Sequence, residues 1–213
     1  DIANLYVLAN EPHGALAYIN KALEILQNIY KGVDTLEVAL CYHIIAYAHS
    51  LLGDHTQSEQ YNKKALEIRS KILGPDSSAC ATSHTNLGSN YYALKRYDEA
   101  MMHTQKAIDI LAQIYGPVHP DLASAYSFVA GINCDLQNFD EALKYNKKAM
   151  EVTEKVHGKN SQNYFALACN LGAILQTQGK IEEATKQFQE VIETIKTYNP
   201  NDPLIGQLTL LIS

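Results

Sequence analysis

Histidine and cysteine are the residues of this sequence that most readily suggest chemistry, because both bind transition metals and both serve in catalysis. The chain contains eight histidines and four cysteines. A zinc site usually takes two ligands from one helical turn or one tight loop, as in CxxC or HExxH, and neither spacing occurs here. The cysteines lie far apart, at Cys41, Cys80, Cys134 and Cys169. We therefore expect no metal, no cofactor, and thiols that stay reduced, as in a cytoplasmic protein.

Catalytic groups are equally isolated in the sequence. His43 and His84 are predicted to lie on neighbouring helices and could approach each other, but core or surface histidines explain them without a ligand. No GxSxG nucleophile elbow occurs, and Gly116-Pro117 is placed to end a helix rather than to open a phosphate-binding loop. His119 is expected to satisfy nearby backbone carbonyls. The sequence therefore predicts a protein that is not an enzyme.

Composition excludes several further classes of protein. The 213 residues have a formal net charge of −6, with 46% apolar and 19% charged residues. The acidity is spread along the chain and leaves no basic stripe for phosphates, so we expect no nucleic-acid partner. No run approaches the roughly 18 apolar residues that cross a bilayer, so we expect no membrane insertion and a cytoplasmic location.

An internal repeat organises the whole chain. A shift of 42 positions superimposes glycines and alanines at equivalent places, namely Gly74, Gly116 and Gly158, then Ala65, Ala107 and Ala149, and then Ala100, Ala142 and Ala184. Each unit holds two stretches in which apolar residues recur with the helical period of 3.6, for example 81–94 and 97–115. No run alternates as a strand would. The sequence therefore predicts an all-α protein built from helix pairs.

Glycine and proline predict where these helices end. Gly116 can take the left-handed conformation that closes a helix, and Pro117 cannot continue it. Asp121, after Pro120, is expected to cap the next helix. Small residues recur where helices should meet closely, at Ala46, Gly88, Ala130 and Gly172 in the first helices. A large side chain there would overpack the contact, at a cost of about 1–3 kcal/mol.

The spacing Leu87-Gly88-x-x-Tyr91, followed by Tyr97, Ala100 and Ala107, resembles the tetratricopeptide repeat. The unit is longer than the usual ~34 residues, and in this it is similar to the repeats of kinesin light chains and clustered-mitochondria-type proteins. The resemblance implies a right-handed α-solenoid, or superhelix, of antiparallel helix pairs. HEAT-type repeats are the competing solenoid, but they lack this glycine, tyrosine and alanine spacing.

The predicted organisation is a single solenoid domain, 1–213, with about five units. Their approximate limits are 1–35, which begins inside a first helix at 1–9, then 36–78, 79–120, 121–162, 163–203, and a partial helix 204–213. Solenoid ends normally need polar caps, whereas 204–213 is strongly apolar. We therefore expect a fragment of a longer protein.

The resemblance also implies a binding surface, because in such stacks the first helices line the concave groove. The positions implied to face a peptide are His43, Ile44, Tyr47, Thr82, Thr85, Asn86, Ser89, Tyr92, Ser127, Phe128, Asn170, Ala173 and Gln176. None is a lysine or arginine, and carboxylates need charge-assisted donors. The sequence therefore favours a non-catalytic protein-interaction scaffold that binds a neutral or amphipathic peptide or helix over one that binds an acidic tail.

Several alternatives remain open at this point. Asn86 and Asn170 could simply bond neighbouring groups, and Tyr47 and Phe128 could be core residues if the register is shifted by one. A structural role is the alternative function: oligomerisation or intramolecular docking through the open apolar ends, with self-association through 204–213.

Overall fold

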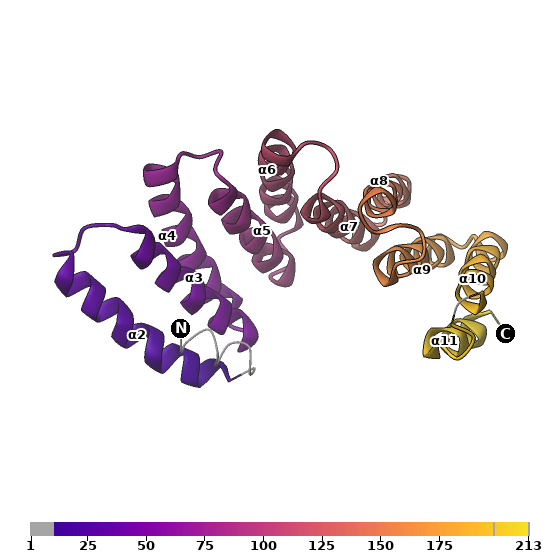
Figure 1. Cartoon of the computed structure of the whole chain (residues 1–213), viewed down its shortest axis with the longest axis horizontal. Helices are drawn as coiled ribbons and strands as arrows, with labels where there is room; N and C mark the ends of the chain where they lie inside the picture. Colours follow the sequence, from indigo (N-terminus) through magenta and orange to yellow (C-terminus); the bar gives the residue numbers. More distant parts are fainter. Residues whose placement is uncertain (1–10, 198, 213) are drawn as a thin grey trace. The chain divides into compact units, whose positions relative to one another are not determined.

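Helices make up the regular structure of the described residues, 11–197 and 199–212, in the computed structural model (Figure 1). They run in the order α2 (Pro12–Ile29), α3 (Leu36–Leu51), α4 (His55–Leu73), α5 (Ser78–Ala93), α6 (Tyr97–Tyr115), α7 (Pro120–Asp135), α8 (Phe139–His157), α9 (Gln162–Thr177), α10 (Ile181–Lys196) and α11 (Pro203–Leu211). The all-α prediction is confirmed. The helix expected at 1–9 lies outside the described residues.

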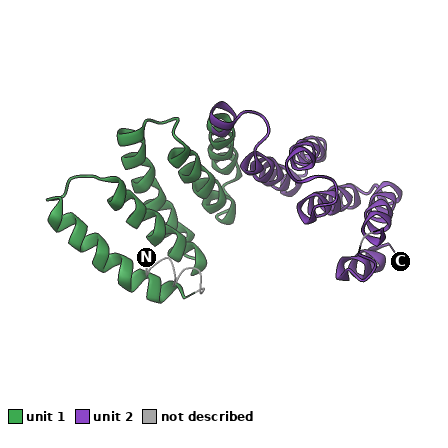
Figure 2. Cartoon of the chain, viewed as in Figure 1, with its two compact units in different colours: residues 1–110 green, residues 111–213 purple. Residues whose placement is uncertain are grey.

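The chain divides into two compact units, residues 1–110 and residues 111–213 (Figure 2). In the first, α2 packs on α3, α3 on α4, and α4 on α5. In the second, α7 packs on α8, α8 on α9, α9 on α10, and α10 on α11. These helices thus pack mainly against their neighbours in the chain, as in a repeat array.

The predicted helix bounds are close to those observed. The helix expected at 97–115 is α6 itself, whereas the one expected at 81–94 begins earlier, at Ser78. The earlier start extends the apolar face by one residue, because Cys80 is fully buried.

Turns between the helices require left-handed backbone at equivalent positions. Gly116 has φ +77° after α6, as its place at a helix end predicts. The shorter turn inside each helix pair uses Gly53 and Gly179 in two pairs, but Lys95 and Gln137 in the other two, with φ 58° and 60°. These two non-glycine residues hold a conformation that costs L-residues roughly 1–2 kcal/mol.

The cap of α7 differs from the prediction. Asp121 does not cap this helix; His119 does, because its Nδ1 accepts the backbone N–H of Asp121 at 3.3 Å. Pro120 occupies the first helical position, so the capping place falls one residue before it. His119 also stacks on Tyr115, with ring centroids 4.3 Å apart. The expectation that His119 donates to nearby backbone carbonyls is wrong for Nδ1, because this atom accepts a hydrogen bond from a backbone N–H.

Close helix contacts occur where the small residues predict them. A Cβ added to Gly88 would lie 2.7 Å from Thr104 Oγ1, and one added to Gly172 would overlap Cε1 at the edge of the Phe188 ring. Ala46, Ala100 and Ala142 are fully buried. The small side chains therefore set how closely first and second helices pack.

Candidate functional site

A hydrogen bond between His43 and Asn86 joins two first helices, α3 and α5, within the first unit. The Asn86 amide nitrogen lies 3.1 Å from His43 Nδ1. Burial, and then the charge of Arg69, lower the pKa of His43, so the imidazole is neutral at physiological pH. An amide nitrogen only donates, so Nδ1 accepts and the His43 proton lies on Nε2. The two side chains thus fix a polar contact between repeats.

Other predicted positions of this unit lie around that contact on α3 and α5. Tyr47 is 46% exposed, and Thr82, Thr85 and Ser89 are exposed residues with hydroxyl groups. We call these four exposed residues the first-helix face. Tyr92 is half-buried, with its ring 5.8 Å from that of Tyr97. Ile44 is only 4% exposed and packs with Ile19, Cys41 and Ile45. Ile44 therefore belongs to the core, contrary to the expected exposure.

The predicted positions of the second unit lie on α7 and α9. Asn170, Ala173 and Gln176 are exposed, whereas Ser127 and Phe128 are half-buried. Each unit therefore presents an uncharged set of these residues on its own first helices.

A buried arginine lies close behind the first-helix face. Arg69, from α4, is 8% exposed, and its Nη1 donates to Ser83 Oγ at 2.7 Å and to the Ala79 carbonyl at 3.3 Å. Desolvation lowers the pKa of Arg69, but the group remains charged. This arginine was not among the predicted residues. The repeat register could have indicated it, because Leu111 and Ile195 occupy the equivalent position in other repeats and are buried. A charged residue at a position that is buried in other repeats predicts a buried charge.

Two further histidines pair between α5 and α6. The Nδ1 atoms of His84 and His103 lie 2.8 Å apart, both residues are 8% exposed, and the His103 ring stacks near Tyr91. Burial, followed by the charges of His84, Lys106 and Lys63, lowers the pKa of His103 to about 4, so one neutral ring donates to the other. His84 therefore pairs with His103 and not with His43. The described residues show no group of three or more potential ligands that could hold a metal ion.

Glu59 is the centre of a polar cluster that the sequence did not predict. Its carboxylate accepts hydrogen bonds from Lys63 at 2.6 Å, Tyr91 at 3.0 Å and Arg96 at 3.1 Å, and Arg96 also pairs with Glu99. Burial raises the pKa of Glu59, but the hydrogen bonds from Lys63 and Tyr91 and the nearby cations outweigh it and lower the pKa overall. The cluster ties α4 to α5 and to the start of α6, and we call it the Glu59 hub.

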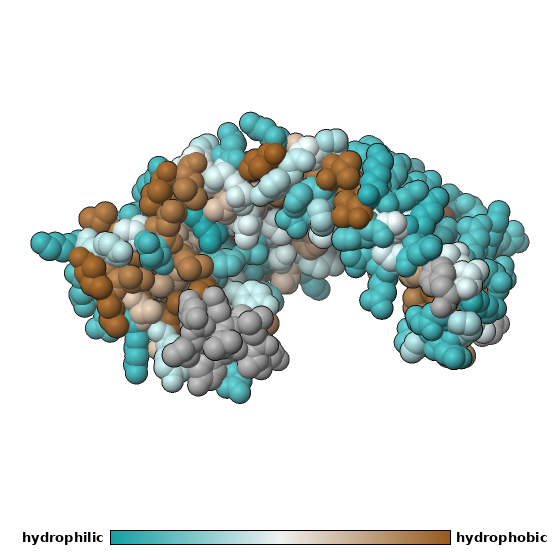
Figure 3. Space-filling model, in the orientation of Figure 1, coloured by the Kyte–Doolittle hydropathy of each residue, from teal (hydrophilic) through white to brown (hydrophobic). Residues whose placement is uncertain are grey.

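Apolar side chains are also exposed on the first unit, near the ends of α2 and α4 (Figure 3). The exposed set includes Ile25, Ile29, Val33, Ile72 and Leu73. Lys71 Nζ lies 4.0 Å from Asp34 Oδ2, which places the end of α4 beside the loop after α2. This apolar edge holds none of the predicted site residues.

Comparison with known proteins identifies the architecture. The sequence pattern of the tetratricopeptide repeat matches residues 1–71, 37–113, 78–132 and 121–197. The chain belongs to the tetratricopeptide repeat family. This match confirms the resemblance drawn from Leu87, Gly88 and Tyr91. No curated protein matches the chain in sequence.

Solved structures show the same fold. BtubC (BKLC) from P. vanneervenii has a TM-score of 0.81 at 18% identity, over 94% of this chain and 80% of that chain. A putative kinesin light chain from Podosopora anserina with nearly identical TPR-like repeats has a TM-score of 0.79 at 18% identity, over 93% of this chain and 94% of that chain. Aspartyl phosphate phosphatase F from Bacillus subtilis has a TM-score of 0.75 at 18% identity, over 98% of this chain and 52% of that chain.

These likenesses establish a tetratricopeptide-repeat solenoid, the architecture of a protein-interaction scaffold. At such identities they show the fold alone. Among the described helices, none is long and apolar enough to pass through a bilayer. The helix faces described above are the candidate site of this scaffold.

Proposed function

We propose that this scaffold binds a neutral, amphipathic peptide or helix of a partner protein on the first-helix face. The observation that supports the proposal is the His43–Asn86 contact, which holds α3 and α5 side by side with uncharged polar groups and an aromatic ring around it. Both side chains are neutral, so a partner carboxylate would gain no charge-assisted bond from them.

The partner's apolar residues would pack against the exposed ring of Tyr47. Its backbone would hydrogen-bond to Asn86 and to the hydroxyl groups of Thr85 and Ser89 on the next helix. Arg69 does not change this chemistry, because the residue is only 8% exposed and its guanidinium donates to Ser83 Oγ and to the Ala79 carbonyl.

Isothermal titration calorimetry tests the proposal with two designed helical peptides. One has leucine and glutamine on opposite faces, and the other has glutamate in place of each glutamine. We expect the neutral peptide to bind and a Tyr47→Ala, Asn86→Ala double variant to weaken it by roughly tenfold or more, as the loss of one aromatic contact and one hydrogen bond implies.

Tyr30→Ala is the matched control, since Tyr30 is also exposed but lies at the end of α2. It should leave the affinity unchanged. The proposal is refuted if the double variant binds the neutral peptide as well as wild type. It is also refuted if the acidic peptide binds more tightly than the neutral one and the double variant weakens that binding.

Self-association is the second candidate function, supported by one feature of the last described helix. Leu211 of α11 is 53% exposed, while Leu208 on the same helix is buried in the core of the second unit. A second copy of the chain would cover this apolar surface. Light scattering should then show a dimer that Leu211→Lys dissociates, and a concentration-independent monomer would eliminate this candidate.

A further inference from the structure

The Glu59 hub has an incomplete copy in the second unit. A shift of two repeats, 84 positions, carries Lys63 onto Lys147 and Arg96 onto Lys180, so both cations persist. The same shift carries Glu59 onto Leu143 and Tyr91 onto Leu175. The shift carries Glu99, which pairs with Arg96, onto Glu183, so this carboxylate also persists. The second unit therefore keeps both positive charges but lacks the Glu59 carboxylate that contacts both of them and the Tyr91 phenol that donates to this carboxylate.

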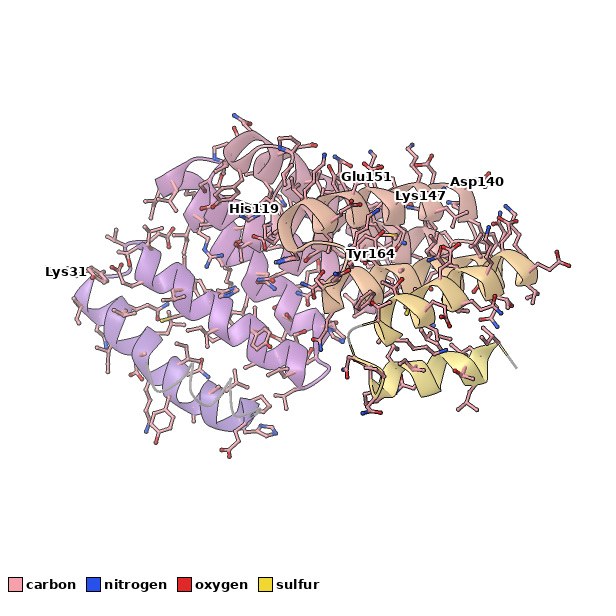
Figure 4. The ribbon with its side chains drawn as sticks, turned by 45° about the vertical axis from the view of Figure 1, so that its right-hand side comes forward. Lys31, His119, Asp140, Lys147, Glu151 and Tyr164 are labelled. Carbon is pink, nitrogen blue, oxygen red and sulfur yellow. The ribbon has the colours of Figure 1, made fainter. Side chains whose placement is uncertain are left out.

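A groove occupies the place where the hub would be. Lys147, from α8, and Lys180, at the start of α10, both line a cavity of about 460 Å³ whose floor includes Leu143, Leu171 and Leu175. The helix α9 packs against both α8 and α10 and so supplies the floor between them. Lys147 lies along one side of α8 with Glu151 about one turn and Asp140 about two turns away (Figure 4).

The charged side chains of this groove form no ion pair in the described part of the unit. Lys147, Lys180 and Lys186 line it together with Glu183 and Glu190, and the ion pairs described for this unit involve none of these five residues. By contrast, Lys63 and Arg96 of the first unit both contact Glu59 within 3.1 Å. The same repeat position is thus satisfied in one unit and unsatisfied in the other.

We propose that the groove between α8 and α10 binds a segment of a partner protein in which an aspartate or glutamate adjoins a leucine-sized apolar side chain. The partner's carboxylate would take the place that Glu59 holds in the first unit, between Lys147 and Lys180. Its apolar side chain would cover Leu143, Leu171 and Leu175. The binding site is separate from the first-helix face, and its ligand is acidic where the other is neutral.

The probes are two tripeptides with blocked ends, Leu-Glu-Leu and Leu-Gln-Leu, which differ only in the charge. Methyl NMR spectra of the whole chain report on Leu143, Leu171 and Leu175 directly. We expect Leu-Glu-Leu to shift these methyl signals and to bind roughly tenfold more tightly than Leu-Gln-Leu, the ratio that one charge-assisted contact gives. Added salt should reduce that ratio.

Two variants separate this contact from nonspecific attraction. Lys147→Met with Lys180→Met should remove the preference for Leu-Glu-Leu, whereas Lys155→Met, an exposed lysine of α8 outside the groove, should keep it. Leu143→Glu should rebuild the hub within the chain and block the peptide. Equal shifts by the two peptides, or a preference that survives the double lysine variant, would overturn the proposal.

Discussion

Replacing Glu59 by glutamine tests whether the Glu59 hub stabilises the first unit. The substitution keeps the shape of the side chain but removes its charge and one acceptor oxygen, so Lys63, Tyr91 and Arg96 can no longer all be satisfied. The Glu59 side chain is 12% exposed, whereas those of Lys63 and Arg96 are 53% and 44% exposed, and water therefore screens much of both ion pairs. The contact with Tyr91, which is 3% exposed, contributes most per bond. We expect a loss of about 1–2 kcal/mol in the free energy of unfolding at pH 7.

The loss should depend on pH in a defined direction. The folded pKa of Glu59 lies below its ordinary value, so the charged form favours the folded state. This contribution is fully present above the unfolded pKa, near 4.5, and disappears as the pH falls through the folded pKa. The difference between wild type and Glu59→Gln should therefore be largest near neutrality and shrink in acid.

Urea unfolding followed by circular dichroism, at neutral and at acid pH, measures both effects. Glu67→Gln is the matched control, because Glu67 also pairs with a lysine four residues on, Lys71 at 2.7 Å, but is 64% exposed. It should change stability little. A Glu59→Gln protein as stable as wild type at pH 7, or a difference that persists unchanged in acid, would show that the hub does not act as described.

Three further predictions concern packing, the turns and the histidine pair, each measured by urea unfolding. Gly172→Ala places a methyl group against the edge of the Phe188 ring and should lower the free energy of unfolding by about 1–3 kcal/mol. Gly131→Ala, with open space around it, should raise that free energy by roughly 0.5–1 kcal/mol, and equal effects of the two substitutions would contradict the close contact. Gln137→Gly relieves the left-handed backbone at φ 60° and should raise stability by about 0.5–1 kcal/mol, and a loss would refute the strain. The pKa of His103 is lowered from 6.5 to about 4, so the neutral His84–His103 pair stabilises the fold above pH 6.5, and this stabilisation is lost as the pH falls toward 4. His103→Gln should therefore make the free energy of unfolding depend less on pH between 6.5 and 4. An unchanged pH dependence would exclude the pair.

The helices and their contacts could be predicted because their signals are local and periodic. Apolar spacing placed the helix at 97–115, and a glycine repeated at each helix end marked the turn at Gly116. The small residues Gly88 and Gly172 located close contacts, since only a missing side chain lets two helices approach so far. These features recur in each unit, so the repeat reinforces them.

The candidate site was harder to predict because repeat position alone does not fix exposure. The resemblance placed Ile44 on the binding face together with His43 and Tyr47 of the same helix. The Ile44 side chain lies in the core instead, although the residue directly follows His43. The sequence allowed His84 to approach His43 but favoured a simple core or surface histidine, and the closer packing within a helix pair brings His84 to His103 instead.

The sequence by itself determined a tetratricopeptide array of helix pairs, since periodicity, helix-ending glycines and small contact residues depend on neighbours along the chain. Only the tertiary structure decided which long polar side chains meet. Glu59 reaches Tyr91 and Arg96 across 32 and 37 positions, and Asn86 reaches His43 across 43. Such contacts depend on the rotamers of flexible side chains and on the exact approach of two helices, and no periodic pattern encodes either.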